Sequence, residues 1–270
     1  MSAQPIQIQV SEVPHRPGIG WTLTDALTIT WRNLRSMLRT PEVIVFSSIQ
    51  PIIFVLTFRY VFGGAVRAIP GVRYVDFLMP GVFVQTVVFG AMNTAVGLSQ
   101  DMQSGIIERF RSLPMSRSAV LAGRTLADLV RNVFVVLLMV AVGYLVGFRV
   151  HTGFGAFLGG IGVVLAFSLA FAWVFALIGL NARDAESAQA ASFPVLALLV
   201  FASAAFVPVD TMPSWLQGYA RNQPVSVTVD AVRRLLIGGP TTDAVLKALI
   251  WIVAIIVVAV PLAVARYRKV

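Results

Sequence analysis

The densest charge in the sequence lies between residues 99 and 128, where carboxylates and guanidinium groups are available for ion pairs and hydrogen bonds with a polar surface. The charged residues of this segment are Asp101, Glu108, Arg109, Arg111, Arg117, Arg124 and Asp128. We predict a short helix from Gly105 to Leu113, which Pro114 ends because proline cannot donate the next backbone hydrogen bond. A connection this long does more than join two helices, although a basic loop that only sets the orientation of the chain would carry the same charges.

Side chains for catalysis, metal binding or nucleotide binding are not grouped anywhere in the sequence. His15 and His151 stand apart from other ligand types, and the chain has no Cys, so we expect no metal site. We find no paired carboxylates and no Ser, His and Asp set for hydrolysis, and we expect no catalytic residues. The G-x-x-x-x-G-K-[ST] motif that cradles nucleotide phosphates is also missing, so we expect this chain to bind no cofactor. Any work that the protein performs must be powered by a partner.

The composition identifies the class of protein that holds these residues. Hydrophobic residues make up 57% of the 270 positions, and charged residues make up 12%, against roughly 25% charged residues in soluble domains. A soluble enzyme or binding module and a disordered chain are therefore excluded. The net charge of +9 comes from short basic segments between apolar runs, so we expect no nucleic-acid partner. The sequence predicts an all-α integral membrane protein.

Six apolar runs are long enough to cross a bilayer core of about 30 Å as helices. They cover residues 43–62, 77–98, 129–148, 154–180, 188–207 and 245–265. No cleavable signal peptide is evident in residues 1–42, so we expect the first run to direct insertion. Twelve of the 21 Lys and Arg residues fall on the side that holds both termini, including the basic tail 266–270, and six fall on the other side. This bias predicts cytoplasmic termini, and the preference for Arg over Lys suggests a GC-rich bacterial source.

The middles of the six runs contain no Asp, Glu or His, which argues against a transporter driven by protons or sodium. Arg131 lies near the end of a run, where a long side chain can reach the interface. The polar groups inside the runs are uncharged, and those that could line a substrate path are Gln50, Gln85, Asn93, Gln189 and Ser192. Each of them could equally be an interhelical hydrogen-bond partner, worth about 0.6 to 2 kcal/mol.

The N-terminal region, residues 1–42, contains an amphipathic pattern between residues 20 and 39. The apolar stripe at helical spacing consists of Leu23, Leu27, Trp31, Leu34 and Leu38. We expect this helix to lie along the cytoplasmic face of the membrane until Pro41 interrupts it. The residues expected at that interface are Trp21, Leu27, Trp31, Arg32 and Arg35. The alternative is a solvated helix that leans on other cytoplasmic segments.

Residues 208–244 are too apolar for a free loop, and prolines interrupt them too often for a membrane span. We expect short helices that re-enter the outer leaflet before the last run, which irregular backbone tolerates only when it is buried in protein or lines a cavity. A compact cap over the bundle is the alternative.

The charged segment between the second and third runs resembles a known family. Its residues Gly105-Ile-Ile-Glu108-Arg109-Phe-Arg111-Ser-Leu-Pro114-Met-Ser116-Arg117, with Gly123-Arg124 after them, resemble the stretch between spans two and three of ABC-2 type exporter permeases. Within that family the chain looks most like the daunorubicin-resistance type, through Val207-Pro208, Met212-Pro213-x-Trp215 and Asn222-Gln223-Pro224-Val225-Ser226 followed by Arg233. Gln103-Ser104 depart from the Arg-Glu pair that many relatives carry before the glycine.

The resemblance implies a six-span ABC-2, or type V exporter-like, transmembrane domain over residues 43–265. Two such chains, either two copies of this one or this chain and a sister permease, would pair with two separate ATPase subunits that bind ATP and Mg²⁺. The residues implied to contact the ATPase are Gly105, Glu108, Arg109, Arg111, Leu113, Pro114 and Arg117.

The same resemblance implies export of hydrophobic or amphipathic compounds, such as a drug-like natural product or a lipid, across a bacterial plasma membrane. An exporter of a lipid-linked polysaccharide is the nearest alternative. A membrane anchor or assembly subunit that transports nothing is an alternative of another class.

Overall fold

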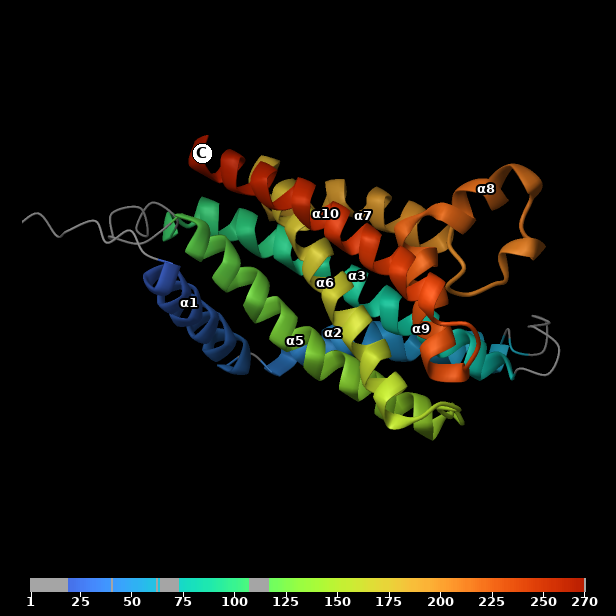
Figure 1. Ribbon diagram of the computed structural model, residues 1–270. Helices are drawn as coiled ribbons and strands as arrows, with labels where there is room; N and C mark the ends of the chain where they lie inside the picture. Colours follow the sequence, from blue (N-terminus) through green and yellow to red (C-terminus); the bar gives the residue numbers. More distant parts are fainter. Residues whose placement is uncertain (1–18, 40, 62, 64–72, 107–116, 270) are drawn as a thin grey trace, which may run out of the picture.

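The computed structural model describes residues 19–39, 41–61, 63, 73–106 and 117–269, and the elements in these ranges are all helices (Figure 1). They are α1 (Ile19–Arg39), α2 (Pro41–Leu56) with a π-helical turn η1 (Thr57–Val61), α3 (Tyr74–Gln103), α5 (Arg117–Leu145), α6 (Phe154–Asn181), α7 (Ala185–Phe201), a 3₁₀ turn η2 (Val209–Thr211), α8 (Ser214–Asn222), α9 (Pro224–Ile237) and α10 (Thr242–Lys269). The all-α prediction is confirmed for this part of the chain.

Helix α3 forms the centre of the bundle, and α5, α6, α7 and α9 pack around it (Figure 1). Its buried side chains include Leu78, Met79, Val82, Phe83 and Val84. Two glycines bring the neighbouring backbone close to α3. A Cβ on Gly179 of α6 would lie 2.5 Å from the carbonyl oxygen of Ala95, and a Cβ on Gly81 of α3 would lie 2.0 Å from that of Ala205. Any larger residue at these positions would force the backbone apart.

Four helices in the described residues are long and apolar enough to cross a membrane: α3, α5 from Leu121 onward, α6 and α10. They correspond to the predicted runs 77–98, 129–148, 154–180 and 245–265. The apolar helices at the other two runs are shorter, Ser48–Val61 and Ala185–Phe201. The structure therefore shows a helical protein with several apolar spans, and the count of six stays a prediction.

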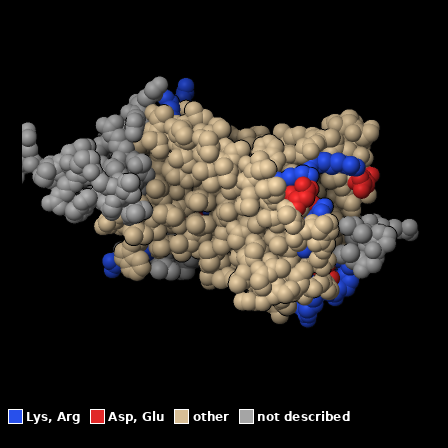
Figure 2. All heavy atoms as spheres, viewed as in Figure 1, with Lys and Arg blue, Asp and Glu red and all other residues tan. Residues whose placement is uncertain are grey.

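The exposed surface matches a membrane setting. Figure 2 shows that the Lys, Arg, Asp and Glu side chains visible on this face gather toward the two ends of the molecule, and its middle is covered by other residue types. Helix α10 contributes much apolar surface, with Val253, Val257, Val258 and Leu262 each more than half exposed. A surface of this kind is expected to face lipid.

The segment between α7 and α10 folds against the N-terminal end of α3. Arg233 of α9 donates hydrogen bonds to the carbonyl oxygen of Phe77 at 3.2 Å and to that of Ala204 at 2.9 Å, and its guanidinium lies 3.8 Å from the centre of the Phe77 ring. The predicted re-entrant segment thus contains α8 and α9, and α9 is packed on α3, α6 and α10. Its entry into a membrane stays a prediction.

A capping box starts helix α7 next to the α6 terminus. The carboxylate of Asp184 accepts a hydrogen bond from the Ser187 amide at 2.7 Å, and the Ser187 hydroxyl accepts one from the Asp184 amide at 3.0 Å. These hydrogen bonds from Ser187 lower the pKa of Asp184. The cap satisfies backbone N–H groups that the first turn of a helix leaves without partners.

Candidate functional site

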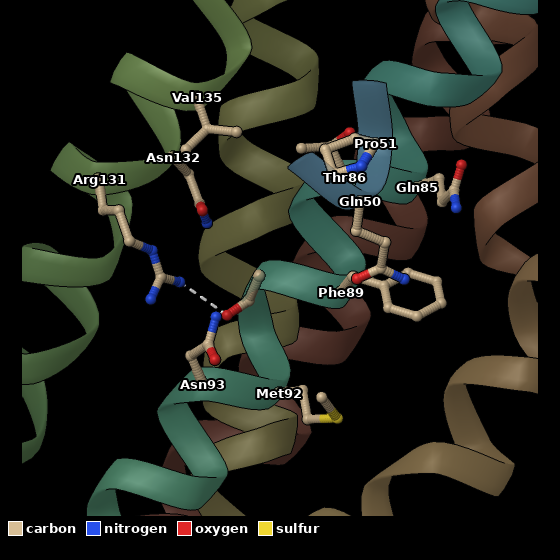
Figure 3. Close-up of a pocket in the computed structure, with 11 residues that line it drawn as sticks. Gln50, Pro51, Gln85, Thr86, Phe89, Met92, Asn93, Arg131, Asn132 and Val135 are labelled. Atoms are coloured by element: carbon tan, nitrogen blue, oxygen red, sulfur yellow. Dashed lines mark hydrogen bonds between the residues drawn. The ribbon is translucent and has the colours of Figure 1, made fainter. Parts of the chain in front are cut away.

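A polar pocket lies between α2, α3 and α5 (Figure 3). Its volume is about 110 Å³. The polar side chains around it are Gln50 of α2, Gln85, Thr86 and Asn93 of α3, and Arg131 and Asn132 of α5. Phe89 and Met92 of α3 add an aromatic and a thioether surface. Hydrogen-bonding groups on three apolar helices therefore meet at a single hollow.

A buried ion pair borders this pocket through Arg131. Arg131 Nη1 lies 3.2 Å from Asp128 Oδ1, and Arg131 Nη2 donates to the Gly90 carbonyl oxygen at 2.7 Å. The other carboxylate oxygen of Asp128 accepts a hydrogen bond from the Thr94 hydroxyl. Both charged residues are less than a tenth exposed. Each charge of the pair thus faces its opposite and additional hydrogen bonds.

Two glycines of α3 leave room for side chains of α5. A Cβ on Gly90 would lie 2.7 Å from Asn132 Oδ1, and a Cβ on Gly97 would lie 1.6 Å from Arg124 Nη2. Arg124 forms an ion pair with Asp101 of α3. Polar contacts thus link the two helices at successive turns, from Arg131 and Gly90 to Arg124 and Asp101.

Two buried oxygen atoms at the pocket lack a hydrogen-bond partner within the described residues: Gln85 Oε1 and Thr86 Oγ1. Gln85 is 2% exposed and Thr86 is 6% exposed. Leaving such a group buried and unpaired costs about 1–3 kcal/mol. Both oxygen atoms are therefore left with unmet hydrogen-bonding capacity inside the bundle.

The structure brings together only some of the residues predicted to line a substrate path. Gln50, Gln85 and Asn93 line the same pocket. Gln189 lies exposed on α7, and Ser192 is buried there with its hydroxyl donating to the Ala188 carbonyl at 2.6 Å. The Ser192 hydroxyl thus bonds within its own helix and not to another helix, and neither residue of α7 lines this pocket.

The predicted position of Arg131 at an interface is wrong. Arg131 is buried, and α5 is continuous from Arg117, so Asp128 and Arg131 both lie within a long helix that packs on α3. The prediction failed because a charged residue near the end of an apolar run normally indicates the end of a membrane span. The available signal was the spacing of Asp128, Arg131 and Asn132, which places three polar side chains on one face of a helix.

The predicted ATPase-contact segment is described only at its edges. Helix α3 ends at Gln103, and Gly105 has a φ of +68°, a conformation that favours glycine. Glu108, Arg109, Arg111, Leu113 and Pro114 lie outside the described residues, as does the side chain of Arg117 at the start of α5. The Asp101–Arg124 ion pair joins α3 and α5 close to this segment.

Helix α1 divides its surface between the bundle and its surroundings. Ala26, Ile29 and Thr30 are buried, and the Thr30 hydroxyl donates to the Gly123 carbonyl of α5 at 3.0 Å. Leu27 is 62% exposed and Trp31 is 67% exposed. Arg32 and Arg35 are also exposed, and the Trp21 side chain lies outside the described part of the chain. The helix thus leans on α5 with one face and leaves part of its apolar stripe open.

The sequence is similar to those of several known transport permeases. The family model described as ABC-2 type transporter matches residues 24–237. The daunorubicin resistance ABC transporter permease protein DrrB1 of Streptomyces coeruleorubidus is 36% identical over 223 residues, which cover 83% of this chain and 78% of the relative. The probable doxorubicin resistance ABC transporter permease protein DrrC of Mycobacterium tuberculosis is 27% identical over 248 residues, which cover 92% and 89%. The putative transport permease ycf38 of Cyanophora paradoxa is 27% identical over 73% of this chain and 69% of its own.

Proposed function

This chain belongs to the ABC-2 type transporter family, and from that membership we propose that it is the transmembrane permease subunit of an ATP-binding cassette exporter for hydrophobic or amphipathic compounds. Drug-like natural products are the favoured cargo, because relatives that are 36% and 27% identical carry the names of daunorubicin and doxorubicin resistance permeases. A lipid is the second candidate cargo. The direction of transport is outward across a bacterial plasma membrane, with both termini cytoplasmic.

The observation that carries this proposal is the polar pocket inside an apolar bundle. Gln50, Gln85 and Asn93 come from two helices and line one hollow. Lipid tails cannot satisfy amide groups, so such groups in an apolar helix need protein partners, water or a polar part of a cargo. A compound with a large apolar body and a few polar groups fits this combination.

The energy for transport comes, in this proposal, from two copies of a separate ATPase subunit that binds ATP and Mg²⁺. A second permease, either a second copy of this chain or a sister chain, completes the transporter. The ATPase contacts the segment from Gly105 to Arg117, and the polar contacts between α3 and α5 support transmission of its movement into the bundle.

Copurification tests the partner. We expect a soluble ATPase with a P-loop motif to accompany the tagged permease in a mild detergent. Reconstituted with ATP, the complex should move a fluorescent amphipathic compound across the vesicle membrane. An assembly that contains no ATPase, or one that hydrolyses ATP and moves no compound, would favour the anchoring role over transport.

A charge-reversal variant tests the contact segment. E108R/R109E should leave membrane insertion intact and uncouple ATP hydrolysis from transport, because both residues are expected outside the bilayer. The matched control is D243K/K247D, which reverses an exposed ion pair near the start of α10. Equal transport by both double variants would overturn the coupling role of the segment.

Replacement of pocket amides tests the site. N93L should reduce transport of an amphipathic dye several-fold, since it removes a hydrogen-bonding group from the pocket. The control is N222L, which alters an exposed asparagine on α8. A lipid-linked polysaccharide that competes with the dye in the wild type would instead favour the glycan alternative.

A further inference from the structure

A groove lies between the last turns of α6 and the first turns of α7. Its walls are mostly apolar, with Leu177, Ile178 and Ala182 on the α6 side and Ala191 on the α7 side. The volume is about 540 Å³, which is within the range of about 300–1,000 Å³ for pockets that hold small molecules. Ala191 is exposed, so the groove opens to the surroundings of the bundle. The walls suit a hydrocarbon chain, and any selectivity of the groove must come from its polar end.

The groove lies at the level where a membrane changes from hydrocarbon to head groups. Leu180 of α6 packs in one buried cluster with Leu98 of α3 and Tyr267 of α10, so these three helices end on the same side of the bundle (Figure 1). The last turns of α6 are apolar up to Leu180, and polar residues begin at Asn181. An apolar helix that ends in this way reaches the interfacial region of a bilayer at its polar residues. In the proposed orientation, this end belongs to the cytoplasmic leaflet.

Charges of both signs stand at the polar end of the groove. Arg183 lines the groove, and its guanidinium forms no ion pair within the described part of the chain. Asp184 follows directly, and hydrogen bonds from Ser187 together with the charge of Arg183 lower the pKa of Asp184, so its carboxylate is ionised at neutral pH. Glu186, in the first turn of α7, is exposed. One cation and two carboxylates thus lie within four consecutive residues.

This charge pattern distinguishes between lipid head groups. A phosphate can accept hydrogen bonds from the planar guanidinium of Arg183. A lipid with negative charge alone would also face Asp184 and Glu186, whereas a primary ammonium can donate hydrogen bonds to those carboxylates. A quaternary ammonium has the same charge and no hydrogen to donate. The pattern therefore matches a head group that carries both a phosphate and a primary ammonium.

We propose that this groove binds one phospholipid of the cytoplasmic leaflet whose head group carries a phosphate and a primary ammonium. One acyl chain lies along Ile178 and Ala191, the phosphate lies at Arg183, and the ammonium lies toward Asp184 and Glu186. The proposal goes beyond the proposed function, because this lipid is a resident part of the permease and is not its cargo. Bound there, the lipid braces the start of α7 against the end of α6.

Native mass spectrometry of the full-length chain in detergent, without ATPase or nucleotide, tests the lipid class. The probes are dimyristoyl phosphatidylethanolamine, phosphatidylcholine and phosphatidylglycerol, which share their acyl chains and differ in the head group. Each lipid is titrated at one protein concentration, and the fraction of protein that carries a single lipid is measured. We expect phosphatidylethanolamine to bind about two- to fivefold more tightly than the other two, the size expected from contacts between exposed charges.

Charge variants identify the head-group contacts. D184N/E186Q should bring the preference for phosphatidylethanolamine over phosphatidylcholine close to one, and D184N keeps a side-chain oxygen that can cap α7. R183Q should weaken the binding of all three lipids by about two- to fivefold, because each of them carries a phosphate. The control D243N/K247Q removes an exposed ion pair near the start of α10, at the other end of the bundle, and should leave the preference unchanged.

A bulky residue in the groove tests where the acyl chain lies. A191W should reduce the binding of all three lipids, because the indole ring occupies the groove. A190W is the matched control, since Ala190 is also exposed on α7 and does not line the groove. Equal lipid binding by the two variants would overturn the proposal. If A191W also lost dimers in the same spectra, a second copy of the chain would be the occupant.

Equal binding of the three lipids by the wild-type protein would overturn the proposal too, as would a preference that survives D184N/E186Q. None of these measurements involves an ATPase or a cargo. Absence of transport in vesicles would therefore count against the proposed function and leave the lipid site intact, and loss of lipid selectivity would do the reverse.

Discussion

Helices α3 and α10 are both long enough to cross a membrane, yet they meet their surroundings in opposite ways. The most apolar stretch of α10 has a mean hydropathy of 3.0 and is 22% buried, whereas that of α3 has a mean hydropathy of 1.6 and is 83% buried. Lipid tails are as apolar as a protein core, so the most hydrophobic helix gains nothing from moving inside. Small and polar residues gain contacts with other helices, and α3 carries them.

The contrast shows where to search for function in a protein of this class. Helix α3 holds the glycines that leave room for Asn132 and Arg124 of α5, the hydroxyl that binds Asp128, and most of the polar pocket. Helix α10 offers Val253, Val257 and Val258 to its surroundings. Of these two helices, the one with the higher mean hydropathy is the one more exposed to lipid. The site lies on α3, the helix with the lower mean hydropathy.

The largest effect is expected at the buried ion pair of α5, which also bonds to Thr94 and Gly90 of α3. D128N or R131Q alone should lower the free energy of unfolding by about 3–5 kcal/mol, because each leaves the other charge buried and alone. The double variant D128N/R131Q should recover at least half of this loss, since no lone charge remains. Thermal unfolding in one detergent measures the three variants. Losses that simply add in the double variant would show that the two residues do not interact.

Backbone contact gives the next largest difference. G179A should lower the free energy of unfolding by about 1–3 kcal/mol, because its Cβ would press on the carbonyl oxygen of Ala95 and separate α6 from α3. G162A in the same helix meets no atom within 4 Å and should be neutral or slightly stabilising. Unfolding temperatures of the two variants provide the test. Equal values would contradict the central position of α3 in the bundle.

The same truncation in the two contrasted helices should have unequal effects. V88A in α3 removes two methyl groups from a side chain with no exposed surface and should lower the free energy of unfolding by about 1–2 kcal/mol. V258A in α10 alters a side chain that is 59% exposed and should change this free energy by less than about 0.5 kcal/mol. A larger loss for V258A in the isolated chain would contradict the lipid-facing assignment of α10.

The smallest effect concerns the capping carboxylate of Asp184 and appears only in acid. The pKa of Asp184 is lower in the folded protein, so its capping contribution is complete above the ordinary carboxyl pKa of about 3.9 and is lost as the pH falls through the folded value. D184N keeps a capping oxygen that does not titrate. The difference in unfolding temperature between wild type and D184N should be constant from pH 5 to 8 and change only below about pH 4. A change near neutral pH would refute this assignment.

The helices could be predicted from the sequence because hydrophobicity and proline positions act locally. The predicted runs 77–98, 154–180 and 245–265 lie within α3, α6 and α10, and 129–148 overlaps α5. Helix ends were harder to predict, since α5 continues as a helix through charged residues that packing on α1 and α3 accommodates. Local composition carries no information about that packing.

The site could be predicted only in part. Gln85 and Asn93 stand in an apolar helix, as Gln189 and Ser192 do, and nothing in the neighbouring residues indicates which pair faces a pocket. The role of Arg131 depends on the Gly90 carbonyl, 41 positions earlier in the chain. Contacts of this kind arise from the crossing of two helices, which a single sequence does not record.

The hydrogen bond between Arg233 and Phe77 joins residues that are 156 positions apart, and this separation sets an order of events during synthesis. At about 5–20 residues per second, Arg233 leaves the ribosome roughly 8–30 s after Phe77. For that interval the beginning of α3 has no guanidinium to engage its carbonyl group, and the nascent chain must keep α3 in place with the neighbours already made. The contacts of this end of α3 are therefore complete only after α9 has been synthesised. A chain truncated before α9 would lack the hydrogen bond from Arg233 to the Phe77 carbonyl oxygen.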